Sequence, residues 1–264
     1  MRRAILILAR QWLPLQRRAR LFRAVVPRRY WFSAVLMLGR AHGILARLAG
    51  CREYAHRELS CIDGWLGELT NSGPFAVDYK MVGAEHLRKT SDDRAGILCC
   101  MVHLPLTAMS MRGCVDLGAA PEYIIAAPHN INQDGRWLPA GAGEGFKAIA
   151  PGPFTLLQAR KVLQKGGRLA SMLDEDVGTP LRPALMRLAG SMGARVVLCW
   201  AEMDAERNLV ITYRTPVHPI PDTEEKVSAN MAAVEEERQR ALDSLRGPVL
   251  RSRSLAWRRE NARS

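Results

Sequence analysis

The N-terminal quarter of the sequence contains no lysine and almost no acidic residue. Residues 1–60 carry thirteen arginines, opposed only by Glu53 and Glu58, so the net charge of this segment is +11. The whole chain has a formal net charge of +12, and a second group of arginines lies between residues 246 and 263, so the middle of the chain is nearly neutral. Two basic ends around a neutral centre favour a polyanionic partner, either an anionic membrane or a nucleic acid.

The six cysteines show neither a CxxC pair nor a spacing of histidine and cysteine that suits zinc. Cys99, Cys100 and Cys199 lie within apolar runs, where free thiols pack as small hydrophobic side chains. We therefore predict no disulfide framework, no metal site and a reducing compartment.

Long uninterrupted apolar runs are also missing. The longest uncharged stretch near the N-terminus, residues 30–39, has only ten residues, whereas a membrane-spanning helix needs about 20. The apolar residues 4–9 are too few for the core of a secretory signal. These lengths argue against a membrane span but leave binding to a membrane surface open.

Residues 1–70 are predicted to form a basic, amphipathic helical region that associates with membranes. Leu36, Ile44 and Leu48 recur at helical spacing between arginines. One interpretation is a set of interfacial helices on anionic lipid. A second interpretation, of equal weight, is a helix pair packed on the core with a solvated basic face. The basic tail, residues 247–264, is predicted to be flexible.

Residues 71–246 are predicted to form an α/β domain with a mostly parallel central sheet flanked by helices. Runs that are typical of strands alternate with segments of helical pattern, and this order is typical of such a sheet. Leu209–Arg214 is predicted to add an edge strand. The other predicted strands lie at residues 75–81, 96–101, 122–127, 168–173 and 195–200, and the predicted helices at 154–164, 183–192 and 223–245.

A histidine and three acidic residues follow two of the predicted strands. His103 lies just after residues 96–101, and Asp174, Glu175 and Asp176 directly follow another strand. In an open α/β sheet, ligands bind beyond the carboxyl ends of the strands, where a histidine is well placed to act as a general base. Two ionisable strand ends in one sheet therefore indicate a site, although a structural histidine and an acidic turn would give the same pattern.

Several stretches between residues 70 and 216 occur in a characteristic order. They are residues 82–87 (VGAEHL), 96–103 (GILCCMVH), 162–167 (VLQKGG), 173–176 (LDED), 188–189 (LA) and 193–197 (GARVV). In this order and spacing they resemble the lipid A biosynthesis acyltransferases, which belong to the lysophospholipid acyltransferase superfamily.

The resemblance implies transfer of a fatty acyl group from a thioester, on acyl carrier protein or CoA, to a hydroxyl of a lipid or metabolite. It also implies a peripheral location at the cytoplasmic face of the inner membrane and no cofactor, since the acyl thioester is a co-substrate. In such enzymes a histidine removes the proton of the acceptor hydroxyl, and an acid five residues later orients it. His103 matches the histidine, but Ala108 stands where the acid is expected.

Three explanations for Ala108 are open. Asp174 orients His103 from another strand, or His103 acts as a weakly activated base on a more reactive acceptor, or the site is inactive and retained to bind acyl chains or acyl carrier protein. The first explanation gives His103 and Asp174 catalytic roles. The candidates for binding substrate are Arg136, Lys147, Glu175 and Asp176.

Nucleic-acid binding is the remaining alternative, and it rests on the basic charge alone. The sequence has no recognised nucleic-acid-binding motif, and its N-terminal arginines lie beside apolar and aromatic residues rather than in a polar stripe. We therefore expect an anionic membrane surface, acyl carrier protein or acyl-CoA, and a lipid acceptor as partners, and no nucleic acid.

Overall fold

The structure is a computed structural model, and it describes most of the chain between residues 15 and 246. The strand predicted at 75–81 lies mostly outside the described residues, and Arg136, Asp176 and the tail 247–264 lie outside them entirely. The described residues are 15–27, 30–51, 54–71, 79–88, 96–126, 146–175, 179–206, 208–218 and 223–246.

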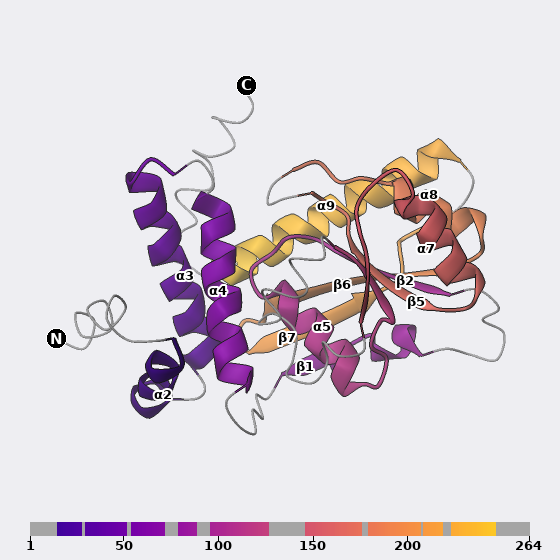
Figure 1. Ribbon diagram of the computed structural model, residues 1–264. Helices are drawn as coiled ribbons and strands as arrows, with labels where there is room; N and C mark the ends of the chain where they lie inside the picture. Colours follow the sequence, from indigo (N-terminus) through magenta and orange to yellow (C-terminus); the bar gives the residue numbers. More distant parts are fainter. Residues whose placement is uncertain are drawn as a thin grey trace.

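A mostly parallel sheet of seven strands forms the centre of the described residues (Figure 1). Its order is β1-β7-β6-β2-β5-β3-β4, and the β6–β7 pair is antiparallel whereas the other five pairs are parallel. The predicted α/β fold with a mostly parallel sheet is thus confirmed. The strands are β1 (Lys80–Val82), β2 (Ile97–Met101), β3 (Tyr123–Ile125), β4 (Lys147–Ile149), β5 (Arg168–Met172), β6 (Arg195–Met203) and β7 (Leu209–Arg214).

The prediction that Leu209–Arg214 is an edge strand is wrong. β7 lies between β1 and β6, and pairs in parallel with the first and antiparallel with the second. All of its residues except Arg214 are buried. The short strand β1, whose three residues are exposed, forms this edge of the sheet instead.

Helices cover both faces of the sheet (Figure 1). One hydrophobic cluster joins the first face of the sheet to α2, α3, α4 and α5, and a second cluster joins the opposite face to α7, α8 and α9. The N-terminal helices therefore share a core with the sheet. The helices are α2 (Leu15–Val25), α3 (Trp31–Leu48), α4 (Tyr54–Asn71), the short 3-10 helix η2 (Ala84–Leu87), α5 (Thr107–Asp116), α7 (Thr155–Gln164), α8 (Ala184–Ser191) and α9 (Glu224–Arg246).

Strand β2 is buried along its whole length, and its side chains alternate between the two clusters. Ile97, Cys99 and Met101 pack on the α2–α5 side, and Leu98 and Cys100 pack on the α7–α9 side. A strand that is covered on both faces needs an apolar residue at each position, which is why its sequence is a continuous apolar run.

Helix α3 has one apolar face in the core and another exposed to solvent. Val35 and Leu36 are buried, whereas Ile44 and Leu48 are 58% and 79% exposed. Leu36 thus lies on the buried face of α3, and Ile44 and Leu48 lie on the exposed face, because eight and twelve residues are not whole numbers of helical turns. None of the described helices is both long and apolar enough to cross a membrane.

Gly96, at the start of β2, gives a test of the central strand pairing. A Cβ atom at this position would lie 2.1 Å from the carbonyl oxygen of Gly167, which precedes β5. Because a backbone atom cannot move aside as a flexible side chain can, Gly96→Ala is expected to lower the free energy of unfolding by about 1–3 kcal/mol. Gly152→Ala is the matched control, since nothing lies within 4 Å of a Cβ there. Equal denaturant midpoints for the two variants would contradict this pairing.

Candidate functional site

The carboxyl ends of β2 and β5 lie side by side at the centre of the sheet. The two strands pair in parallel register as far as Met101 and Met172. The N–H of Leu173 then donates to the carbonyl oxygen of Met101 at 2.7 Å, which extends the pairing by one residue. Because parallel strands end at the same edge of a sheet, the residues that follow them meet there. His103 follows β2, and Asp174 follows β5.

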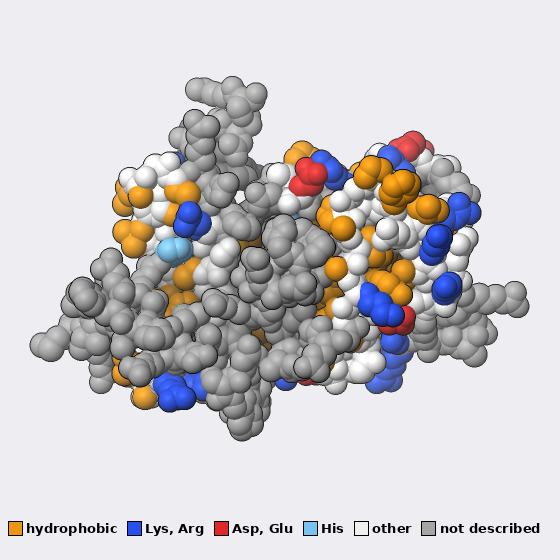
Figure 2. Space-filling view, viewed as in Figure 1, with side chains coloured by type: hydrophobic (Ala, Val, Ile, Leu, Met, Phe, Trp, Pro, Cys, Tyr) orange, Lys and Arg blue, Asp and Glu red, His pale blue; other side chains and the backbone are white. Residues whose placement is uncertain are grey.

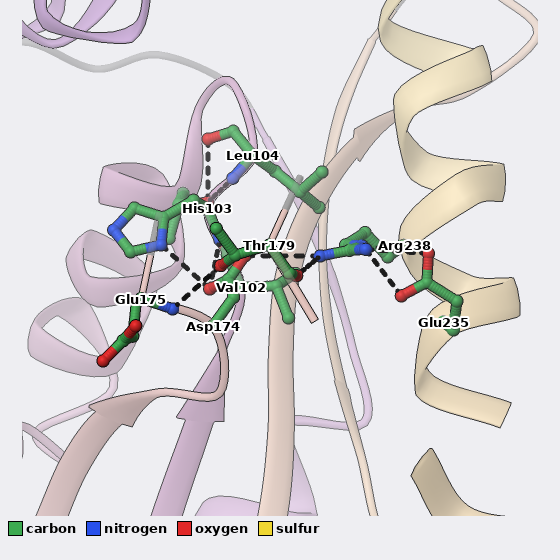
Figure 3. Close-up of polar contacts among 9 residues, drawn as sticks. Val102, His103, Leu104, Asp174, Glu175, Thr179, Glu235 and Arg238 are labelled. Atoms are coloured by element: carbon green, nitrogen blue, oxygen red, sulfur yellow. Dashed lines mark hydrogen bonds and ion pairs between the residues drawn. The ribbon is translucent and has the colours of Figure 1, made fainter. Parts of the chain in front are cut away.

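Asp174 accepts hydrogen bonds from both the backbone and the ring of His103 (Figure 3). The His103 N–H lies 3.0 Å from Oδ1 and 3.1 Å from Oδ2, and the ring Nδ1 lies 2.8 Å from Oδ1. The Asp174 side chain is fully buried, whereas 26% of the His103 side chain is exposed. A carboxylate in this position favours the tautomer with the proton on Nδ1. Nε2 is then the ring nitrogen that can accept a proton.

A hydrogen-bonded loop carries His103 into α5. The Thr107 hydroxyl accepts from the N–H of Leu104 at 3.1 Å and lies within hydrogen-bond distance of the carbonyl oxygens of Val102 and Leu104, at 2.9 and 2.8 Å. Leu106 is fully buried and has a φ of 70°, in the left-handed region. That conformation costs a non-glycine residue about 1–2 kcal/mol, so the surrounding packing must hold the loop in this shape.

A buried alanine occupies the position where the resemblance places an acid. Ala108 lies in the first turn of α5 and is 8% exposed. The carboxylate that contacts His103 comes instead from Asp174, 71 residues further along the chain. The structure thus brings His103 and Asp174 together, as the first of the three explanations requires.

Arg238 of α9 approaches Asp174 from the side opposite His103 (Figure 3). Its Nη1 lies 3.5 Å from Oδ2 of Asp174 and donates to the carbonyl oxygen of Thr179 at 3.0 Å. Its Nη2 donates to Oε1 of Glu235 at 2.8 Å. Only 10% of the Arg238 side chain is exposed. The fully buried carboxylate therefore has a cationic partner, which offsets part of the cost of its desolvation.

The sequence-based prediction missed Arg238, although its spacing distinguishes it. Arg238 lies four residues after Val234 and three before Ala241, on the buried stripe of α9. An arginine on the buried stripe of an amphipathic helix indicates an acidic or carbonyl partner in the core. The other buried residues of this stripe are Val227, Asn230, Val234, Ala241 and Leu245.

Glu175 does not face the ring of His103. Its side chain is 59% exposed and forms an ion pair with Arg182. Its backbone N–H donates to the Thr179 hydroxyl at 3.1 Å, which closes the turn after β5. Asp176, the third predicted acid, lies outside the described residues.

Lys147 lies far from His103 along the strand direction. Lys147 is the first residue of β4 and pairs with Tyr123, the first residue of β3. Tyr123 pairs with Leu169 of β5, and Leu169 pairs with Leu98, the second residue of β2. Lys147 is therefore at the amino edge of the sheet, and the geometry does not support its predicted role in binding substrate beside His103. Its ammonium lies 5.5 Å from the centre of the Tyr123 ring instead. Arg136, the other predicted cation, lies outside the described residues.

A narrow pocket lies on the α9 side of the strand ends. Val102, Leu104, Leu173, Val234 and Arg238 are among its walls. The enclosed space is about 10 Å³, which is room for roughly one water molecule. The pocket is therefore too small in this structure to hold a substrate or an acyl chain.

Cys100 and Trp200 also line this pocket. Burial raises the pKa of the Cys100 thiol to about 12, so this wall residue stays protonated near neutral pH and is a poor nucleophile. Trp200 has its Nε1 buried with no hydrogen-bond partner among the described residues.

The described residues contain no group of three or more His, Cys, Asp or Glu side chains that could hold a metal ion.

Together, the fold and the site define an α/β protein with a histidine–aspartate pair at the carboxyl edge of a mostly parallel sheet. Comparison with models of known protein families gives no match, and comparison with curated proteins gives none either.

Proposed function

We propose that the protein is an acyltransferase in which His103 and Asp174 form the catalytic pair. The observation that carries this proposal is the 2.8 Å contact between Nδ1 of His103 and the buried carboxylate of Asp174. This contact supplies the acid that is missing at Ala108, and it leaves Nε2 to accept a proton. The resemblance to the lipid A biosynthesis acyltransferases favours acyl transfer over other reactions of a histidine base.

In the proposed reaction, Nε2 of His103 takes the proton of the acceptor hydroxyl while the hydroxyl oxygen attacks the carbonyl carbon of an acyl thioester. The carbon–oxygen bond forms and the carbon–sulfur bond breaks. The proton then passes from His103 to the departing thiolate, so the products are an ester and a free thiol. Asp174 stabilises the imidazolium between the two proton transfers, and Arg238 holds Asp174 in place.

The donor is an acyl group on acyl carrier protein or CoA, and the acceptor is a hydroxyl of a lipid or metabolite. We would incubate the purified protein with each donor and a total lipid extract. The proposal predicts a product heavier than an extract component by one acyl group in place of a hydrogen, and one thiol released for each ester formed. If mass spectrometry finds no such product with either donor, acyl transfer is overturned, and a protein that only binds acyl chains or carrier protein is favoured.

We further propose that the protein lies peripherally on the cytoplasmic face of the inner membrane, with the exposed face of α3 against anionic lipid. Met37, Ile44, Leu45 and Leu48 are between 54% and 79% exposed and lie on the side of α3 away from the core. Helices α2 and α3 contain no acidic residue. Apolar side chains would enter the interface, and each nearby arginine would contribute about 1 kcal/mol of attraction to an anionic surface.

A glutamate on this face is expected to weaken membrane binding. Leu48→Glu removes an apolar side chain from the interface and adds a charge that anionic lipid repels, so the partition coefficient onto anionic vesicles should fall about tenfold. Val217→Glu is the control, because Val217 is 71% exposed but lies outside α2 and α3. Co-sedimentation measures the bound fraction, and equal losses for the two variants would contradict binding through α3.

A further inference from the structure

The loop between β2 and α5 has a counterpart between β4 and α7. Residues 103–107 (HLPLT) and 151–155 (PGPFT) share a proline in the third place and a threonine in the fifth, and each threonine is the first residue of its helix. In the sheet, β5 and β3 separate β4 from β2. The two loops can be compared within one molecule, because only the first of them carries the candidate base.

In the first loop, the Thr107 hydroxyl contacts the peptide groups on both sides of His103. The carbonyl oxygen of Val102 belongs to the peptide group before His103 and lies 2.9 Å from Oγ1 of Thr107. The N–H of Leu104 belongs to the peptide group after His103 and donates to the same hydroxyl oxygen at 3.1 Å. Asp174 accepts from the N–H of His103 itself. Because both flanking peptide groups are held, the backbone torsions that aim the ring at Asp174 have little freedom.

In the second loop, the Thr155 hydroxyl holds the peptide groups around Pro151 in the same way. The N–H of Gly152 donates to Oγ1 of Thr155 at 2.7 Å, and the carbonyl oxygen of Ala150 lies 3.1 Å from this oxygen. This loop leads into α7 at the surface, and Figure 2 shows hydrophobic and basic side chains together over the part of the surface where Figure 1 draws α7. The hydroxyl contacts are thus shared by both loops, and the residue that they hold differs.

The two loops also differ in the backbone of the residue before the threonine. Leu106 is fully buried and has a φ of 70°, whereas Phe154 is 67% exposed and has a φ of −98°. The hydroxyl contacts therefore do not need a left-handed residue. Of the two loops, only the one that carries His103 has this strained conformation, and backbone strain of this kind is concentrated at functional sites.

We propose that Thr107 is a positioning residue, whose hydroxyl fixes the backbone on both sides of His103 and so holds the ring against Asp174. This inference rests on the proposed acyl transfer, in which the ring must meet the acceptor hydroxyl in one orientation. Only 7% of Thr107 is exposed, so it acts through His103 rather than on the reacting atoms. The need for a fixed backbone is strict, because a displacement of about 1 Å can cost on the order of 100-fold in rate.

The test removes the hydroxyl without changing the size of the side chain. Thr107→Val takes away the acceptor of the Leu104 N–H. We expect it to lower kcat for acyl transfer about 10- to 100-fold, while KM for the donor stays within about twofold of wild type. Thr107→Ser keeps the hydroxyl and should restore kcat to within about threefold of wild type. Thr155→Val is the matched control, because it removes the same contacts from the loop without a histidine, and its kcat should stay within about twofold of wild type.

Three results would overturn the positioning role of Thr107 and leave the proposed function intact. The first is an unchanged kcat in a folded Thr107→Val variant. The second is an equal fall in kcat for Thr107→Val and Thr155→Val, which would indicate a general effect of lost loop contacts. The third is a Thr107→Ser variant as slow as Thr107→Val, because the methyl group rather than the hydroxyl would then be responsible. Absence of any ester product from the wild-type protein would overturn the proposed function instead.

The nitrogen-15 chemical shifts of the His103 ring test the inference even if the wild-type protein forms no ester. Asp174 favours a proton on Nδ1, so Thr107→Val should weaken this preference in the neutral ring, and Thr155→Val should not. Identical ring shifts in wild type and Thr107→Val would overturn the positioning role. If Thr107→Val does not fold, Thr107→Cys replaces it in both measurements, because a thiol is a weaker donor and acceptor than a hydroxyl.

Discussion

His103→Gln is expected to lower the rate of acyl transfer on the order of 10²- to 10⁴-fold, because an amide cannot accept the proton of the acceptor hydroxyl. Glutamine is close to histidine in size and polarity, and 26% of the His103 side chain is exposed, so the fold should remain intact. The loss should appear in kcat rather than in the KM for the donor, since the proton is transferred only in the transition state. Single-turnover measurement of thiol release from the acyl thioester gives this rate directly.

His218→Gln is the matched control for this variant. His218 is exposed, and its backbone rather than its ring bonds to Asn230, so its replacement should leave the rate within about twofold of wild type. Unchanged transfer by His103→Gln, with product still formed, would exclude His103 as the base. Full activity would then require a different proton acceptor at the strand ends.

Asp174→Ala is expected to impair both stability and catalysis. The variant leaves Arg238, of which only 10% is exposed, without its buried carboxylate, and it removes the acceptor of the His103 N–H. Breaking a buried ion pair at one partner costs about 3–5 kcal/mol, which a shift of the urea midpoint would measure. The milder Asp174→Asn keeps the shape but removes the charge, and we expect it to lower the transfer rate on the order of 10²- to 10⁴-fold.

A double-mutant cycle on Asp174 and Arg238 tests the stability part of this prediction. Adding Arg238→Met to Asp174→Asn removes the unpaired cation, so the double variant should be less destabilised than the sum of the two single variants. A coupling energy of about 0.5–3 kcal/mol is typical of residues in direct contact. Simple additivity of the two changes would contradict the Asp174–Arg238 contact.

The central strands of the sheet could be predicted because a strand that is buried on both faces has a continuous apolar sequence. The runs at 96–101, 168–173 and 195–200 are mostly apolar, and each overlaps a strand of the structure, although β6 extends beyond its run to Met203. The place of β7 in the sheet could not be predicted in the same way. A run of apolar residues shows that a strand is buried, but its neighbours are set by pairing between distant segments, here with β1 on one side and β6 on the other.

In the candidate site, too, the positions of the residues could be predicted from the sequence, but their contacts could not. His103 and Asp174 could be named because each directly follows an apolar strand, and strand ends of a parallel sheet meet at one edge. Their hydrogen bond depends on the register that pairs Met101 with Met172, which the sequence does not state. Arg238 carried a local signal, its place on the buried stripe of α9, but its partner could be identified only once α9 was packed on the strand ends.

The central claim is that Asp174 holds His103 as a base, and the tautomer of the His103 ring tests it most directly. Nitrogen-15 chemical shifts of labelled protein, at a pH where the ring is neutral, distinguish a proton on Nδ1 from one on Nε2. The 2.8 Å contact with Asp174 predicts that the proton is on Nδ1 in wild type and that Asp174→Asn weakens this preference. A wild-type ring with its proton on Nε2, unaffected by Asp174→Asn, would contradict the claim, because that ring could not accept a proton from the acceptor hydroxyl at Nε2.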